Sequence, residues 1–178
     1  MAEAPGGLEV VRRFVNTRNV EDGTDDLADI DGLAAFCREH GLAEDGEVTG
    51  ADHDRAVRLR EALRRVLVIH DGGPPDPEAV ADLNQLAADA PLVTRLDDDA
   101  AVTLVPAAEG GGAVLARVLA LVHAAEVDGT FARLKVCPAD DCLSAFYDQS
   151  RNRSRTWCSM EVCGNRAKVR AYRARDRR

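Results

Sequence analysis

The sequence lacks any apolar run close to the roughly 18 residues that a membrane-spanning helix needs. Its first seven residues lack both the basic segment and the apolar segment of a secretory signal peptide. We therefore expect a cytoplasmic protein without membrane contact. Its 178 residues, 46% of them hydrophobic, suffice for one core and a small appended module.

Motifs of catalysis are also missing from the sequence. It contains no nucleophile elbow, no phosphate-binding loop, no paired catalytic carboxylates and no metal motif with an open coordination position. The four histidines are not spaced as metal ligands: His40, His53, His70 and His123. We therefore expect that the protein is not an enzyme, and an enzyme with its site in the first 130 residues is the least favoured functional class.

Charge is distributed unevenly along the chain, whose net charge is −8. Residues 1–130 hold 11 Lys and Arg against 26 Asp and Glu, a net charge of −15, whereas residues 131–178 hold 12 against 5, a net charge of +7. Five of the seven aromatic residues also follow residue 130. These shifts predict an acidic domain over 1–130 and a basic domain over 131–178. A basic segment of this kind indicates contact with nucleic acid or another anionic surface.

Apolar periodicity and helix-capping residues predict that the acidic domain is mostly helical. The expected helices cover about residues 31–40, with Asp31 as N-cap, 52–70, 76–89 and 112–127. The last of these is apolar on several sides, which predicts a helix at the centre of the core. Two short β-branched runs, 92–96 and 101–105, flank three aspartates and predict a β-hairpin. The fold class is therefore mainly α with a small β-hairpin, followed by a separate cysteine-rich domain.

Four of the five cysteines form the clearest motif. Cys137 and Cys142 make one C-x4-C pair, Cys158 and Cys163 make a second, and fifteen residues separate the pairs. Two such pairs supply four thiolates to one tetrahedral Zn²⁺, and a four-sulfur shell leaves no position for a substrate, which predicts a structural zinc site. Two disulfides and an iron–sulfur cluster are the alternatives.

Basic residues surround the second cysteine pair. The segment after Gly164 is predicted to be a helix with a stripe of arginines at spacings of 4, 3 and 4: Arg166, Arg170, Arg173 and Arg177. Val169 and Tyr172, on the neighbouring face, are expected to pack on the zinc module. The candidate nucleic-acid ligands are Arg151, Arg153, Arg155, Arg166, Lys168, Arg170 and Arg173. The alternatives for the stripe are a solvated surface and a dock for the acidic domain of the same chain.

Motifs in both domains resemble a bacterial family. Cys137-Pro-x-x-x-Cys142, Trp157-Cys-Ser-Met160 and Cys163-Gly-Asn-Arg-Ala-Lys-Val-Arg170 are similar to the CGNR zinc finger, over about residues 130–175. Phe14-Val-Asn-Thr17 and Arg58-Leu-Arg-Glu-Ala62 resemble the ABATE domain that precedes this finger. The resemblance implies a stress-induced transcription regulator that binds zinc through the four cysteines.

Two functional interpretations lead. The first is a DNA-binding transcription regulator whose N-terminal domain senses a signal or dimerises, and the second is a zinc-stabilised protein-interaction module without sequence readout. A small-molecule ligand in the acidic domain and a homodimer are further expected partners. Phe14-Val-Asn-Thr17 is interpreted as a cap or turn device in preference to a pocket lining. The acidic domain is expected to stay folded when chelation removes the zinc.

Overall fold

The computed structural model describes residues 2–43, 48–107 and 111–175. In these ranges, the helices are α1 (Leu8–Asn16), α2 (Ile30–Glu39), α3 (Gly50–Leu67), α4 (Pro77–Ala88), α5 (Gly111–Val127) and α6 (Asn165–Arg175). Shorter helical turns are η1 (Ile69–Asp71), η2 (Phe131–Arg133) and η3 (Met160–Gly164). None of the described helices is long and apolar enough to cross a membrane.

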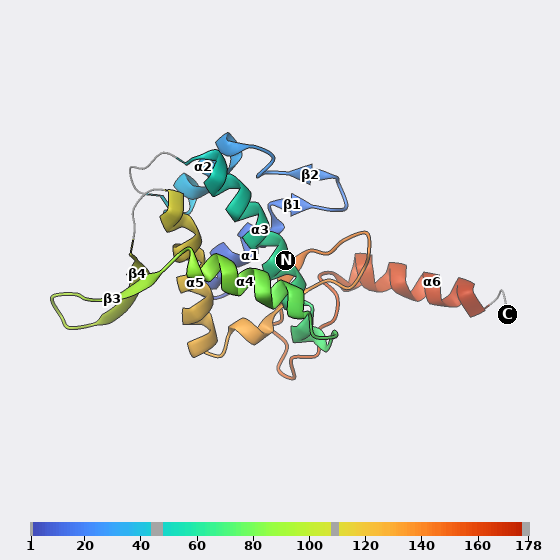
Figure 1. The fold of residues 1–178 in the computed structure, drawn as a ribbon. Coiled ribbons are helices and arrows are strands. Elements are labelled where there is room, and N and C mark those ends of the chain that lie inside the picture. The colour runs from blue at the N-terminus through green and yellow to red at the C-terminus, as the bar shows by residue number, and fades with distance from the viewer. Residues whose placement is uncertain (1, 44–47, 108–110, 176–178) are drawn as a thin grey trace.

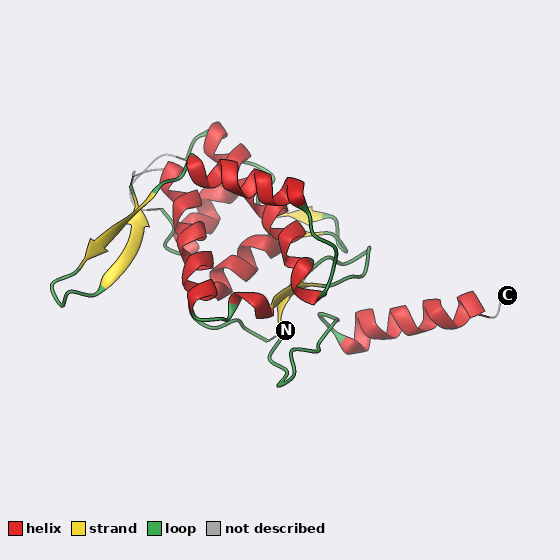
Figure 2. Ribbon diagram, turned by 60° about the horizontal axis from the view of Figure 1, so that its bottom comes forward, coloured by secondary structure: helices red, strands yellow, loops and turns green. Residues whose placement is uncertain are grey.

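The described strands form three two-stranded antiparallel sheets. They pair β1 (Arg18–Asn19) with β2 (Thr24–Asp25), β3 (Leu92–Leu96) with β4 (Val102–Pro106), and β5 (Leu134–Val136) with β6 (Ala145–Tyr147). Helices α1 to α5 pack together, while the β3–β4 hairpin and α6 project from opposite ends (Figure 1, Figure 2). The predicted fold class, mainly α with a small hairpin and a four-cysteine module, is confirmed.

Capping side chains set where the helices start. Thr49 and Asp52 form a reciprocal capping box at α3, and the Asp76 carboxylate accepts a hydrogen bond from Ala79 N at α4. The expected cap of α2 is wrong by two residues, because Asp29 accepts from Gly32 N at 2.9 Å. Asp31 lies inside the first turn of α2, where its carboxylate interacts favourably with the positive end of the helix dipole but is not the N-cap.

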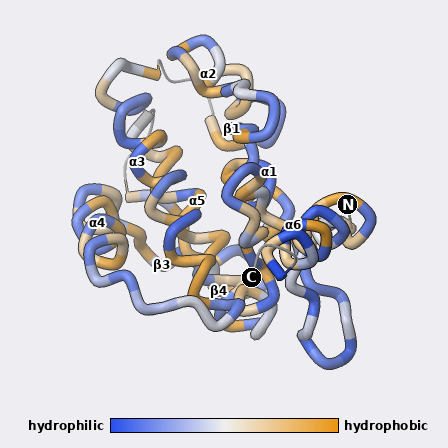
Figure 3. Tube along the Cα trace, turned by 90° about the vertical axis from the view of Figure 1, so that its right-hand side faces the viewer, coloured by the Kyte–Doolittle hydropathy of each residue, from blue (hydrophilic) through white to orange (hydrophobic). Residues whose placement is uncertain are grey.

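The main core lies between α1, α3 and α5. Its fully buried side chains include Phe14 of α1, Leu63 of α3 and Val118 of α5. Hydrophilic and hydrophobic positions alternate along α1 and α3, as expected for helices with one buried face (Figure 3). The first half of α5 is buried, with 1% or less of Val114, Leu115 and Val118 exposed, whereas its last turn is open to solvent, with Val127 72% exposed.

The same core extends past residue 130. Phe131, Leu134, Val136, Ala145 and Tyr147 are buried in one cluster with side chains of α1, α3 and α5. The β5–β6 hairpin therefore packs directly on the helical body, here defined as residues 2–43, 48–107 and 111–130. That the two domains on either side of residue 130 fold independently stays a prediction. Side chains from both sides of this boundary pack in the same apolar core.

Candidate metal centre and basic surface

Four cysteine thiols converge beside the β5–β6 hairpin. The sulfurs of Cys137, Cys142, Cys158 and Cys163 all lie within 4.8 Å of one another, and all four residues are buried. Cys158 Sγ lies 3.5 Å from Cys142 Sγ and 3.6 Å from Cys163 Sγ. Thiolates on one tetrahedral Zn²⁺ stand about 3.8 Å apart, because each Zn–S bond is about 2.3 Å long. The spacing fits zinc, and none of these cysteines forms a disulfide.

The first cysteine pair occupies the turn between β5 and β6. Cys142 N donates to Ala139 O at 2.9 Å, and Cys137 N donates to Ser144 O at 2.9 Å, which closes the turn above the strands. Leu143 has a positive φ of 52°, a conformation that reverses the chain directly after Cys142. This turn directs both thiols to the same side.

The second cysteine pair spans the π-helical turn η3. Ser159 caps it through Val162 N at 3.3 Å, and Gly164 N donates to Ser159 O. A Cβ on Gly164 would lie 2.4 Å from Met160 Sδ, so the exposed Met160 side chain would have to move to admit a larger residue where this turn joins α6. Trp157 lies over the same glycine and packs against the four cysteines with Ala139 and Phe146.

Burial and hydrogen bonds shift the pKa values of the thiols in opposite directions. Burial raises the pKa of Cys137 and of Cys158. Burial also acts to raise the pKa of Cys142, but hydrogen bonds with Ser144 and the neighbouring cysteines lower it overall. Zinc supplies the positive charge that lets buried thiols bind together as thiolates. The four-sulfur donor set therefore fits this metal.

Two family models match this architecture. The ABATE model, described as "Putative stress-induced transcription regulator", matches residues 8–129, and the CGNR zinc finger model matches residues 133–176. The chain belongs to the ABATE family. It carries a CGNR zinc finger after the ABATE domain, and the expected zinc cofactor is confirmed. The comparison with curated proteins gives no match.

Three of the predicted nucleic-acid ligands make contacts inside the protein. Arg155 donates to the carbonyl oxygens of Trp157 and Cys158, and its guanidinium lies 5.2 Å from the Phe146 ring centre. Arg166 donates to Cys163 Sγ at 3.2 Å, and this hydrogen bond raises its pKa. It also pairs with Glu21 at 2.8 Å.

Arg170 pairs with Asp141 at 3.1 Å, but 53% of its side chain stays exposed. The side chains of four other candidates are exposed and form no hydrogen bond or ion pair within the described ranges: Arg151, Arg153, Lys168 and Arg173. Arg177 lies outside the described residues.

The orientation expected for α6 is wrong. Val169 is 48% exposed and Tyr172 is 67% exposed, so neither packs on the zinc module. The arginine face turns inward because Arg166 follows Cys163 by three residues and Asp141 lies opposite Arg170. Sequence reasoning also missed Arg175, which is exposed on the other face of α6. The i, i+4, i+7 spacing of Lys168, Tyr172 and Arg175 is the signal that identifies that face.

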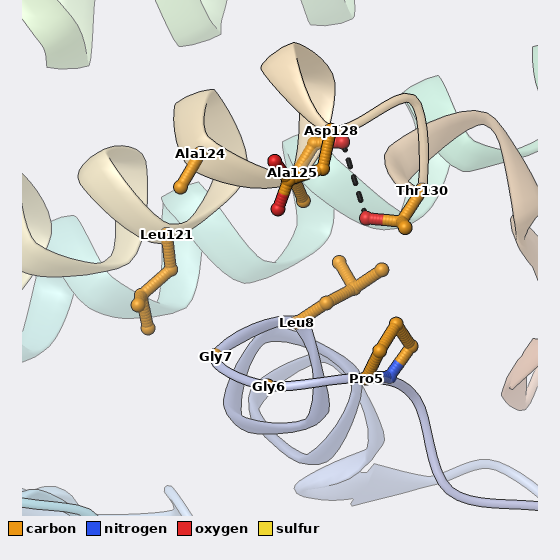
Figure 4. A pocket seen from close by; sticks show the side chains of 9 residues that line it. All are labelled: Pro5, Gly6, Gly7, Leu8, Leu121, Ala124, Ala125, Asp128 and Thr130. Carbon is orange, nitrogen blue, oxygen red and sulfur yellow. Dashed lines mark hydrogen bonds between the residues drawn. The ribbon is translucent and has the colours of Figure 1, made fainter.

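Phe14 and Thr17 of the ABATE motif, near the end of α1, have structural roles. Phe14 is fully buried, and the Thr17 hydroxyl donates to Phe14 O at 2.7 Å, a bond typical of a helix end. A separate pocket of about 150 Å³ lies between the start of α1 and the end of α5 (Figure 4). Asp128 and Thr130 face Leu8 and Pro5 across it (Figure 4). A small-molecule ligand for this domain stays a prediction.

Proposed function

We propose that this protein is a transcription regulator that binds DNA through the exposed basic surface of α6 and the loop over residues 150–156. The observation that carries the proposal is the charge and exposure of α6. This helix has five basic and no acidic residues and no buried side chain, and it projects away from the body (Figure 2). In this proposal the ABATE domain senses a signal or dimerises, and the protein is not an enzyme.

Physical chemistry supports an external partner for α6. Isolated helices shorter than about 12–15 residues are marginal in water, and neighbouring like charges weaken them further. The 11 residues of α6 are therefore expected to form only a marginally stable helix in water without a partner. At 1.5 Å per residue the helix is roughly 16 Å long, and a helix fits the major groove of DNA.

One face of α6 has the groups that nucleic acids recognise. Lys168, Tyr172 and Arg175 lie on a stripe opposite Arg166 and Arg170, whose guanidiniums pair with carboxylates. Lysine and arginine contact phosphate oxygens, and an aromatic ring contacts sugars or bases. Upstream, the exposed Arg151 and Arg153 add two cations on the neighbouring loop.

A second candidate function is a protein-interaction module. Exposed apolar side chains on η3 and α6 favour it: Met160, Val162, Val169 and Tyr172. Exposed apolar side chains on an element that also carries cations are suited to an acidic protein surface as well as to DNA. The pairing of Arg166 with Glu21 also shows that carboxylates reach this element.

Titration of a labelled random-sequence duplex with the full-length zinc protein tests the proposal. In a Lys168→Ala, Arg175→Ala double variant we expect weaker binding to all sequences. The slope of log K against log salt should fall by about two units, since each lost phosphate contact removes about 0.9. The matched control is the Arg38→Ala, Arg95→Ala double variant on α2 and β3, which also removes two exposed positive charges.

Three outcomes oppose the DNA proposal. If wild type and the control variant bind no duplex at low salt, while an acidic protein is captured and Val169→Ser abolishes that capture, the interaction module replaces the DNA proposal. If duplex binding weakens in the double variant without a change in salt slope, α6 does not contact phosphates. A salt slope that falls equally in the Arg38→Ala, Arg95→Ala control assigns the effect to net charge alone.

A further inference from the structure

The two cysteine pairs of the zinc site belong to parts of the chain that are held in different ways. The β5–β6 hairpin carries Cys137 and Cys142 in its turn. Leu134, Val136, Ala145 and Tyr147 on one face of this hairpin are buried in the main core. On the opposite face, Phe146 packs against the cysteines. Because neighbouring residues of a β-strand point to opposite faces, the hairpin packs on the body with one face and on the cysteines with the other. It thereby attaches the first pair to the body.

Two side chains of the body form hydrogen bonds with the backbone that follows Cys142. The Asn16 side chain donates to Ala145 O at 2.8 Å and accepts from Ala145 N at 2.7 Å, as a neighbouring strand would do. Arg64 of α3, with 6% of its surface exposed, donates to Leu143 O at 2.6 Å and to Val15 O at 2.6 Å. Asn16 and Arg64 thus tie the cysteine turn to α1 and α3.

The second pair has no comparable attachment to the main core. No residue after Tyr147 in the described part of the chain belongs to that core, and Trp157, Cys158 and Cys163 pack only within the small cysteine cluster. Against the hairpin it packs through the cluster that contains Phe146. Its other links to the body and hairpin are polar. They include the Arg166–Glu21 ion pair and the hydrogen bonds of Lys135 Nζ to the carbonyl oxygens of Arg153 and Arg155, at 2.8 and 3.1 Å.

We propose that Asn16 and Arg64 are positioning residues of the zinc site, which hold the first cysteine pair as a half-site on the body. Zinc then binds the second pair to this half-site and, with it, fixes the direction of α6. The ABATE domain is thereby part of the metal centre's support. The proposal concerns zinc binding and does not depend on which macromolecule α6 contacts.

The expected effect follows from what the two side chains order. Without Asn16, both hydrogen-bonding groups of Ala145 lose a protein partner and the turn gains freedom, which zinc binding must then remove. Groups outside the ligand shell that orient ligands typically change metal affinity by 10- to 100-fold. We expect roughly a tenfold rise in the zinc Kd for Asn16→Ala, and a similar rise for Arg64→Met.

Competition with a chromophoric zinc chelator measures that Kd on the full-length protein. Asn84→Ala on α4 is the matched control, since Asn84 is exposed in a helix. Asn16→Asp should fall between wild type and Asn16→Ala, because a carboxylate accepts from Ala145 N but donates nothing to Ala145 O. Equal zinc Kd values for wild type, Asn84→Ala and Asn16→Ala overturn the proposal.

A background without a complete zinc site separates positioning from general stabilisation. If Asn16 positions the half-site for zinc, Asn16→Ala should lower the thermal midpoint less in a Cys158→Ser protein than in the zinc-loaded protein. An equal loss in both backgrounds shows a structural role alone and contradicts the proposal.

Hydrogen exchange of the wild-type chain tests the same idea without any substitution. After chelation, amides over residues 134–147 should stay protected on the body, while those over residues 158–175 should exchange rapidly. Simultaneous loss of protection in both segments, or in neither, overturns the inference that zinc joins a body-held half to a second half.

Discussion

Helices α5 and α6 differ in almost everything except their secondary structure. In α5, Val114, Leu115 and Val118 are at most 1% exposed, whereas no residue of α6 is buried. Packing stabilises α5, and its sequence is apolar on several sides as a result. The position of α6 is set over its first two turns, by the cysteine cluster and by the ion pairs of Arg166 with Glu21 and of Arg170 with Asp141. One helix is fixed by the core and the other by a metal centre.

Removal of the zinc is expected to have the largest effect on the difference between α5 and α6. The protein is expected to contain about one zinc per chain, and Cys158→Ser should reduce this to near zero because three thiolates are left. Structural zinc couples on the order of 10 kcal/mol to folding, so α6 should lose its helix signal while α1 to α5 keep theirs.

Metal analysis and circular dichroism measure both effects, and Cys37→Ala is the control because Cys37 is buried in the body away from the cluster. Retention of full helix content by the Cys158→Ser protein would show that α6 does not depend on the metal. Loss of all helix signal would show instead that the body depends on it too.

Truncation of one side chain in each helix sharpens the contrast. Leu115→Ala in α5 should lower the free energy of unfolding by about 2–5 kcal/mol, since it leaves a cavity at a site that is 1% exposed. Val169→Ala in α6 should change it by less than about 0.5 kcal/mol. Urea unfolding of both variants provides the values, and similar losses in the two would disprove the difference in packing.

Acid should act more strongly on a body carboxylate than on the one beside α6. Burial acts to raise the pKa of Glu9, but hydrogen bonds from Arg12, Ala4 N and Arg13 lower it from 4.5 to about 2. This lowered pKa adds stability that is fully present above pH 4.5 and is lost as the pH falls toward 2. Glu9→Gln should therefore cost about 1–3 kcal/mol at pH 7 and almost nothing near pH 2.

Asp141→Asn is the counterpart on the α6 side. The hydrogen bond from Arg170 lowers the pKa of the exposed Asp141, which has the same sign of pH dependence but is screened by water. Urea unfolding between pH 2 and pH 7 gives both curves, and subtraction of wild type cancels the shared effect of zinc release. A larger pH-dependent difference for Asp141→Asn than for Glu9→Gln would contradict this ranking.

The sequence predicted the features that strong local signals encode. The cysteine spacing identified the cluster that the structure brings together, and apolar periodicity with capping residues located α3, α4 and α5. The β3–β4 hairpin was predicted because β-branched runs flank Asp97 to Asp99. In each case the residues that determine the element lie close together in the chain.

The features that were missed depend on distant partners. Helix α1 was not predicted, since its N-cap Gly7 forms no side-chain cap and signals no helix start. Strands β5 and β6 have three residues each, too few for alternation to be recognised. The inward turn of Arg166 depends on Glu21 and on a thiol, and the pairing of Asn16 with Ala145 joins residues 129 positions apart.

The β5–β6 hairpin also constrains how this chain can change in evolution. Its register pairs Lys135 with Phe146 between the pairs formed by Leu134 and Val136. A slip or deletion of one residue would turn Phe146 toward the helices and Ala145 toward the metal centre, because neighbouring residues of a strand point to opposite sides. The strand register that buries one face of the hairpin in the helical core is therefore the same register that turns Phe146 toward the zinc site. Whichever of the two forms first during folding sets this register for the other. We expect insertions to be rejected between Leu143 and Asp148, because the fully buried Asp148 carboxylate pairs with Lys135 at 2.9 Å, and to be tolerated at the exposed Arg151 and Asn152.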